Sequence, residues 1–205
     1  MLAACRAPPP APLLQQAHQQ QQQQQDFADI RRIEGGALHG IDAARSALRI
    51  HVFRAGRAAN LGHNHVLAVP ALQGLLWLPA QGTREARFEL AFRLDQLLID
   101  PPELRAALGP AWASPMSPEA IAATRTNMLG AGNLQADTYP WVRIRSLQIA
   151  GEAPRLAAQI ELELHGQKRS MWLPLRVQLE PRQVRVEGAL VLRQSDFGIK
   201  PFSVL

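Results

Sequence analysis

Two histidines in the segment Gly62-His63-Asn64-His65 have the types and spacing best suited to chemistry in this chain. Residues two apart on an extended segment project to the same face, so His63 and His65 point the same way. Imidazole ligates zinc, copper and iron, which makes the pair a candidate site for a metal ion or haem. A third ligand is required, and no carboxylate or cysteine lies nearby in sequence. The alternative is loop hydrogen bonding or contact with a ligand head group. Candidates for the third ligand are His39, His51 and His165, although alternation places the last two on polar faces.

Catalytic constellations are missing from the sequence. Ser195 and Asp196 have no Gly-x-Ser-x-Gly turn around them. The glycines at 130 and 132 follow a predicted helix, where they indicate a stop and a turn. We therefore predict a protein that is not an enzyme and requires no cofactor. The basic residues that could meet an anionic head group, with a solvated surface role as the alternative, are Arg125, Arg169 and Lys200.

Three segments in the last third of the chain alternate apolar and polar residues almost without a break. They span residues 158–165, 171–179 and 184–193. Because side chains on a strand point to opposite faces in turn, each segment has one apolar face. The linkers are too short for crossover helices, so the strands pair as antiparallel hairpins. Such a series favours a closed or nearly closed barrel with an apolar interior, and a β-sandwich is the alternative.

Further strands are predicted in the middle of the chain. They cover residues 47–54, 66–78, 86–95 and 141–149, and the last slips register near Ser146, which indicates a bulge. The chain is thus mainly β, and these strands join the same barrel.

A helical insertion at about residues 101–130 separates the strands. Asp100 caps its first helix, with proline in the first turn. Ser117 caps the second helix, which ends at Gly130.

Composition excludes several classes of protein. Apolar residues make up 47% of the 205 residues, which is enough for a core. The net charge of +5 is not clustered and aromatic residues reach only 5%, so nucleic-acid binding is not expected. No stretch approaches the roughly 18 apolar residues of a membrane helix. The single cysteine excludes an internal disulfide.

The N-terminal residues 1–37 are predicted to form a disordered tether rich in proline and glutamine. The first five residues resemble the end of a bacterial lipoprotein signal, in which a Leu-Ala-Ala-Cys box ends at a lipidated cysteine. That resemblance makes Cys5 a lipidation candidate and implies membrane association through it. The basic and apolar regions of a signal peptide are missing, so either translation starts upstream or the match is accidental.

Several spaced motifs across residues 38–205 resemble the YceI-like family of bacterial lipid-binding proteins. The resemblance implies an eight-stranded, lipocalin-like, antiparallel barrel with a helical segment near one mouth. It also implies a polyisoprenoid, prenyl quinone or related amphiphile inside the barrel and a location in the periplasm. The motifs are residues 42–46 (DAARS), 127–129 (NML), 134–140 (LQADTYP), 164–169 (LHGQKR), 173–175 (LPL), 188–190 (GAL) and 193–199 (RQSDFGI).

The predicted inward-facing residues are aliphatic or aromatic, which suits a slender apolar ligand. The alternative is that they pack against one another and leave no cavity. The predicted lining is Leu48, Ile50, Val52, Phe88, Leu90, Phe92, Leu94, Ile160, Leu162, Leu164, Leu173, Leu175, Val177, Leu190 and Leu192.

One departure from the family concerns the last strand. In the family, the motif at residues 197–199 is followed by a loop and one more strand, which this chain, ending at Leu205, does not supply. We expect unpaired sheet edges as a result. Three functions stay open: a carrier or store of an amphiphile in the cell envelope, a metal- or haem-binding redox protein, and a remnant without function.

Overall fold

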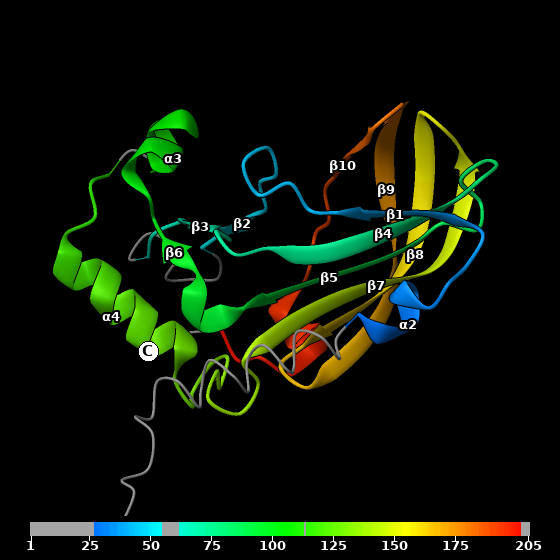
Figure 1. The fold of residues 1–205 in the computed structure, drawn as a ribbon. Helices are drawn as coiled ribbons and strands as arrows, with labels where there is room; N and C mark the ends of the chain where they lie inside the picture. The colour runs from blue at the N-terminus through cyan, green and yellow to red at the C-terminus, as the bar shows by residue number, and fades with distance from the viewer. Residues whose placement is uncertain (1–26, 55–61, 113, 202–205) are drawn as a thin grey trace, which may run out of the picture.

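The computed structural model describes residues 27–54, 62–112 and 114–201 and is mainly antiparallel β. Seven strands form one sheet in the order β1-β4-β5-β7-β8-β9-β10, which curves into a nearly closed barrel (Figure 1). The predicted lipocalin-like barrel is confirmed, with seven strands in the described sheet where the resemblance implies eight. The strands are β1 Gly36–Gly40, β4 Gln73–Pro79, β5 Arg87–Arg93, β7 Trp141–Glu152, β8 Arg155–Leu164, β9 Gln167–Glu180 and β10 Gln183–Gly188.

The two edge strands of this sheet are β1 and β10. They share no ladder of backbone hydrogen bonds within the described residues, but one side chain links them. Arg45, in the segment after β1, donates from Nη1 to Oε1 of Gln183 at 3.0 Å. This link holds the segment after β1 beside the start of β10.

A second antiparallel sheet lies at one end of the barrel (Figure 1). It consists of β2 Arg49–Val52, β3 His65–Ala68 and β6 Leu98–Ile99, with β3 in the centre. The predicted strand at residues 66–78 is therefore two strands, β3 and β4, which belong to different sheets. Pro70 and the turn around it separate them, because proline cannot donate to a ladder.

The helical insertion is confirmed between β6 and β7. It contains α3 Pro102–Ala107, the 3-10 turn η3 Pro110–Trp112 and α4 Pro118–Leu129. Ser117 caps α4 as predicted, accepting the Ala120 N–H at 3.2 Å. The predicted cap at Asp100 is wrong: the N-cap position is Pro101, without a side-chain hydrogen bond, and the Asp100 carboxylate turns toward β3.

The bulge predicted near Ser146 is also confirmed. The register between β7 and β8 shifts between Ser146 and Gln148. The Ser146 hydroxyl accepts the Phe88 N–H at 2.9 Å, so a side chain replaces a ladder partner where the strand bends.

Strand β10 ends earlier than predicted. The alternation suggests a strand over residues 184–193, whereas β10 stops at Gly188, which pairs with Leu175. The next rung would need an N–H from Pro174, which has none. Gly188 also packs closely on β9, since a Cβ there would lie 3.0 Å from the Pro174 carbonyl oxygen. Residues 189–193 leave the ladder as a result.

Two apolar clusters share the interior. The packed-end cluster joins the three-stranded sheet, the helical insertion and the C-terminal segment, residues 194–201, to the barrel. Its buried members are Leu67, Val69, Phe92, Leu94, Leu97, Ile99, Ala136, Val142, Leu162, Phe197 and Ile199. The open-end cluster lies among strands β4, β5, β7, β8, β9 and β10. Its buried members are Ala86, Ile149, Leu156, Ala158, Ile160 and Val177.

A short helix, α2 Ala28–Arg31, covers part of the outer face of the sheet. Phe27 and Ile30 are buried there against Trp77 and Trp141. The predicted tether of residues 1–37 is therefore too long, because apolar side chains from residue 27 onward belong to the folded part. Cys5 and the rest of residues 1–26 lie outside the described residues.

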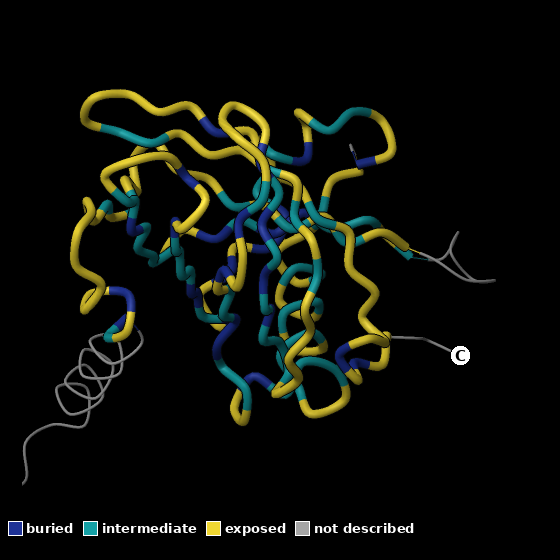
Figure 2. The backbone as a smooth tube through the Cα atoms, turned by 90° about the vertical axis from the view of Figure 1, so that its right-hand side faces the viewer, coloured by how far each residue is buried: buried dark blue, intermediate teal, exposed yellow. Residues whose placement is uncertain are grey.

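Burial varies along the backbone (Figure 2). Strands β3, β5, β7 and β8 each contain two or more buried residues, whereas β1, β2 and β10 contain none. No helix in the described ranges has both the length and the apolar character to cross a membrane.

Candidate functional site

The packed end of the barrel accounts for seven of the predicted lining residues. Four of them are half-buried and pack around Phe92, Leu94 and Leu162, each no more than 4% exposed. Side chains from α4 and the C-terminal segment fill the remaining space. At this end the alternative of mutual packing describes the structure better than an open cavity. The seven residues are Leu48, Ile50, Val52, Phe92, Leu94, Leu162 and Leu164.

The open end accounts for six more, and most of these are incompletely covered. Ile160 and Val177 are buried, whereas the inward-facing leucines of β9 and Leu190 are only half-buried. Leu179 on β9 and Val186 on β10 project to the same inner face and are 47% and 48% exposed. The inner face of β9 and β10 is thus an apolar surface without a full cover. The six residues are Phe88, Ile160, Leu173, Leu175, Val177 and Leu190.

Two predicted lining residues belong to neither cluster. Leu90 is half-buried on β5, where its Cδ2 lies beside Gly74. Leu192 is 42% exposed because β10 ends before it, so its prediction as an inward-facing strand residue is wrong.

A groove of about 660 Å³ opens along β9 where β10 has ended. One wall is the β9 edge from Arg169 to Trp172, and the other is the segment from residue 190 to residue 197. Met171 contributes to the groove and also packs against both interior clusters. This groove therefore marks the boundary between the packed end and the open end.

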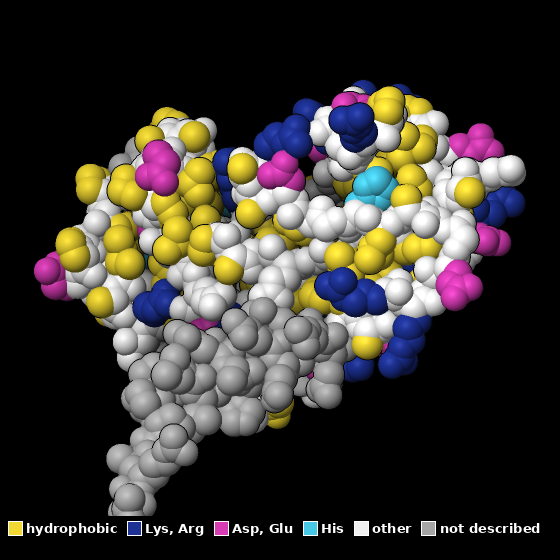
Figure 3. Space-filling view, viewed as in Figure 1, with side chains coloured by type: hydrophobic (Ala, Val, Ile, Leu, Met, Phe, Trp, Pro, Cys, Tyr) yellow, Lys and Arg dark blue, Asp and Glu magenta, His cyan; other side chains and the backbone are white. Residues whose placement is uncertain are grey.

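Hydrophobic side chains gather in patches between charged residues on the face drawn in Figure 3. On the outer face of the sheet, in contrast, cross-strand pairs of opposite charge follow β7, β8 and β9. Arg145 pairs with Glu161 at 2.9 Å, and Lys168 lies 3.6 Å from Glu161 and 3.7 Å from Glu163. A small hollow of about 160 Å³ lies among these charges. Its size and charged walls do not suit a long apolar chain.

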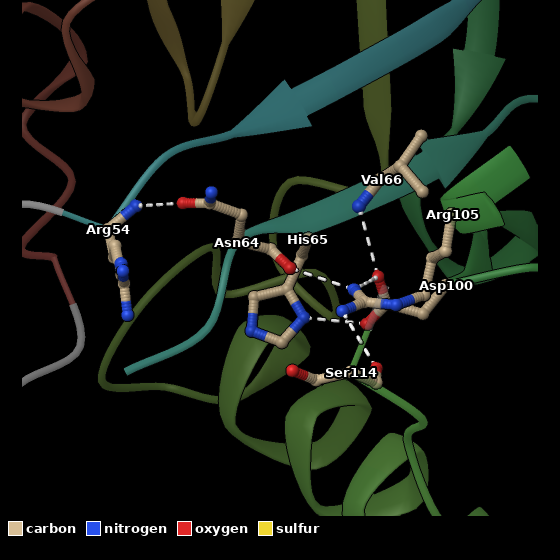
Figure 4. Close-up of polar contacts among 7 residues, drawn as sticks. All are labelled: Arg54, Asn64, His65, Val66, Asp100, Arg105 and Ser114. Carbon is tan, nitrogen blue, oxygen red and sulfur yellow. Dashed lines mark hydrogen bonds and ion pairs between the residues drawn. The ribbon is translucent and has the colours of Figure 1, made fainter. Parts of the chain in front are cut away.

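The two histidines predicted as a pair lie in different environments. His63 is exposed before β3, whereas the His65 side chain is only 20% exposed and contacts Asp100. His65 Nδ1 lies 2.6 Å from Asp100 Oδ2, in a geometry that leaves Nε2 available (Figure 4). A neutral imidazole held in this way donates from Nδ1 and accepts at Nε2.

Asp100 is the centre of a buried polar cluster formed with His65 and Arg105 (Figure 4). Its fully buried carboxylate accepts the Val66 N–H at 3.0 Å and Nη1 of Arg105 at 2.6 Å. Arg105 also donates to the carbonyl oxygens of Asn64, at 2.8 Å, and residue 114, at 3.2 Å. One arginine thus joins α3, the start of β3 and the segment before α4.

The pKa of Asp100 lies below its usual value of 3.8. Burial alone raises this pKa, but hydrogen bonds from His65, the Val66 N–H and Arg105 stabilise the carboxylate and outweigh it. The Asp100 backbone adopts a φ of 52°, which is uncommon for a residue other than glycine. The surrounding hydrogen bonds hold this conformation in place.

The other histidines make different contacts. His51 stacks edge-on against Trp112, with ring centroids 5.6 Å apart. His165, in the β8–β9 turn, bonds through Nδ1 to the Phe197 carbonyl at 3.0 Å, and His39 lies on edge strand β1. Within the described ranges no three His, Cys, Asp or Glu side chains come together to hold a metal ion. Ligation by His63 and His65 stays a prediction.

The sequence does not identify Asp100 as a partner of His65. Its position before two prolines and a glutamate predicts a helix cap instead. A signal was nevertheless present, since an aspartate next to proline at a strand end is also suited to a turn. The separation of 35 residues hid the contact.

Comparison with solved structures identifies the fold. BcnA from Burkholderia cenocepacia matches with a TM-score of 0.56 and 14% identity, over 78% of this chain and 84% of that one. YceI from Campylobacter jejuni matches with a TM-score of 0.50 and 7% identity over the same shares. No protein-family model and no curated protein match the sequence. The chain therefore has a YceI-like fold, and the resemblance seen in the sequence motifs is confirmed at the level of the fold.

Proposed function

We propose that this protein binds a long-chain amphiphile, such as a polyisoprenoid or a prenyl quinone, on the inner face of β9 and β10. The proposal rests on one observation above all: Leu179 and Val186 stay about half exposed on a concave apolar face. Covering such residues with a hydrocarbon chain gains about 25 cal/mol per Å² of apolar area, before the costs of association. The YceI-like fold supports the same proposal, because the family resemblance implies this class of ligand.

The contrast between the two ends favours binding at the open end. Side chains of this protein already cover the packed-end cluster, so a ligand there would have to displace them. At the open end, Leu173, Leu175 and Val184 pack against the cluster but are only half-buried, which leaves apolar surface for a ligand to cover. We infer a binding protein of the cell envelope, one that stores or carries its ligand and has no enzymatic activity.

The first test is extraction of the purified protein with organic solvent, followed by mass spectrometry. A co-purified prenyl lipid, or saturable binding of an added prenyl quinone, is the expected result. Leu175→Arg places a charge on the inner face and should weaken quinone binding by at least about tenfold, which is about 1.4 kcal/mol. Val191→Ser is the matched control, because that side chain is exposed to solvent beyond β10. No recovered lipid together with no quinone binding contradicts the proposal.

A second candidate is metal binding through His63 and His65. The contact between His65 Nδ1 and Asp100 favours it, because a metal-ligating histidine commonly donates its other ring N–H to a carboxylate. Elemental analysis of the protein and of the variant with both histidines replaced by alanine tests this idea. Equal metal content in the two proteins rules it out.

A further inference from the structure

We propose that the groove beside β9 binds an extended peptide segment of a partner protein, which pairs with the β9 edge as an added strand. This site is separate from the inner face proposed for the amphiphile. Its two walls are stretches of backbone, and that feature decides the kind of occupant.

The register of the neighbouring hairpins shows which β9 residues face the groove. Leu164 and Gln167 flank a two-residue turn, and so do Glu180 and Gln183. Because a hydrogen-bonded pair closes such a turn and bonded pairs alternate along the ladder, odd-numbered residues of β9 bond to β8. Even-numbered residues direct their N–H and C=O groups to the other edge.

On that other edge, β10 pairs with β9 only as far as Leu175. In the part of β9 that precedes Leu175, Ser170 and Trp172 therefore present both an N–H and a C=O to the groove. The Lys168 carbonyl is already occupied, since it accepts Nη1 of Arg169 at 2.9 Å. Pro174 has no N–H to present, which limits the free edge to a few residues.

The opposite wall has this character only in its first part, because farther along it the Asp196 carbonyl oxygen accepts Nε of Arg169 at 2.8 Å. Residues 190–192 follow β10 without belonging to a strand, and within the described ranges no turn or loop hydrogen bond involves their backbone. Val191 is 94% exposed and Leu192 is 42% exposed. Two stretches of unpaired backbone thus face a groove of about 660 Å³.

These walls favour a peptide over a hydrocarbon chain. A hydrocarbon would bury the N–H and C=O groups of both walls without partners, and each unpaired group costs about 1–3 kcal/mol. An extended peptide satisfies them, as in other cases where a strand is added to a sheet edge. Apolar side chains at alternate positions of the peptide would meet Met171 and Leu190 on the inner side. Trp172, 48% exposed, would flank it on the outer side.

The experiment measures binding of a short synthetic peptide of alternating threonine and valine to the full chain. Its matched control is the same peptide with N-methyl groups on the residues of one edge, which removes donors and keeps the side chains. The expected result is saturable binding of the first peptide and at least a tenfold loss for the second. Amide hydrogen exchange should slow at Ser170 and Trp172 when the first peptide binds.

A variant of the chain gives an independent readout. Ser170→Pro removes one N–H from the free edge, at a position with the same parity as Pro174, which β9 already accommodates. We expect the variant to retain its melting temperature within a few degrees and to lose peptide binding by at least tenfold. If the variant fails to fold, the comparison of the two peptides still decides.

Three outcomes overturn the proposal. They are no binding of the unmodified peptide, equal binding of both peptides, and unchanged binding by a folded Ser170→Pro variant. Loss of quinone binding in Leu175→Arg does not bear on it, so the two proposals fail separately.

Discussion

The packed end and the open end of the barrel share strands β8 and β9, yet they differ in what covers their apolar faces. At the packed end, the helical insertion, the three-stranded sheet and the C-terminal segment supply side chains that bury Leu162 and Phe197 almost completely. At the open end the same strands continue, but no further element covers Leu179 or Val186. One alternating pattern can therefore make a solid core at one end and an incompletely covered apolar surface at the other.

The largest effect is expected from a variant of the buried polar cluster around Asp100. Asp100→Ala leaves Arg105 buried without its carboxylate partner, and removing one partner of a buried ion pair costs about 3–5 kcal/mol. Urea unfolding of the variant and the natural protein measures the loss. A cost below about 1 kcal/mol would mean that the cluster contributes little to holding the insertion in place.

A pair of leucine variants compares the two ends directly. Leu162→Ala removes a fully packed side chain and should cost about 2–5 kcal/mol. Leu173→Ala removes a half-buried side chain, so its cost should be about 1 kcal/mol, in proportion to the area covered. Prenyl quinone binding should respond in the opposite order: weaker for Leu173→Ala and unchanged per folded molecule for Leu162→Ala. The reverse order would place the ligand at the packed end.

Acid provides a third comparison, because the lowered pKa of Asp100 affects only the packed end. The carboxylate contributes its full stability above its usual, unfolded pKa of 3.8, and the contribution disappears as pH falls through the lower folded value. The stability difference between the natural protein and Asp100→Asn should therefore narrow below about pH 4. Thermal melts from pH 7 to pH 2 measure it, and a constant difference over that range contradicts the assignment.

The smallest effect is expected at the rim of the open end. Val186→Thr keeps the β-branched shape on β10 and changes only a half-exposed surface, so stability should move by no more than about 0.5 kcal/mol. Quinone binding should weaken measurably, since the inner face becomes more polar. Unchanged binding would restrict the proposed surface to β9.

Much of the fold could be predicted because its signals are local. Alternation identified β5, β7, β8 and β9, the cap at Ser117 identified α4, and a slip in alternation identified the bulge near Ser146. The helix α2 was missed because its four residues are too few to show a helical period. Burial of Phe27 and Ile30 against Trp77 and Trp141 places it on the sheet.

The candidate site was less predictable. Each predicted lining residue showed which face of its strand was apolar, but not what lay opposite that face. Leu162 and Leu173 have the same side chain and the same alternation, and only neighbouring elements bury one and leave the other half-covered. The sequence does not reveal the partner of His65 for a similar reason, because strands β4 and β5 lie between His65 and Asp100 in the chain.

By itself, the sequence determined the antiparallel strands, their apolar faces and the place of the helical insertion, because side-chain period and turn residues act over a few neighbouring positions. The tertiary structure alone decided where β10 leaves β9, which end of the barrel is filled and how Asp100 meets His65 and Arg105. Those features depend on contacts between segments far apart in the chain, whose free energies arise only when the whole barrel has formed.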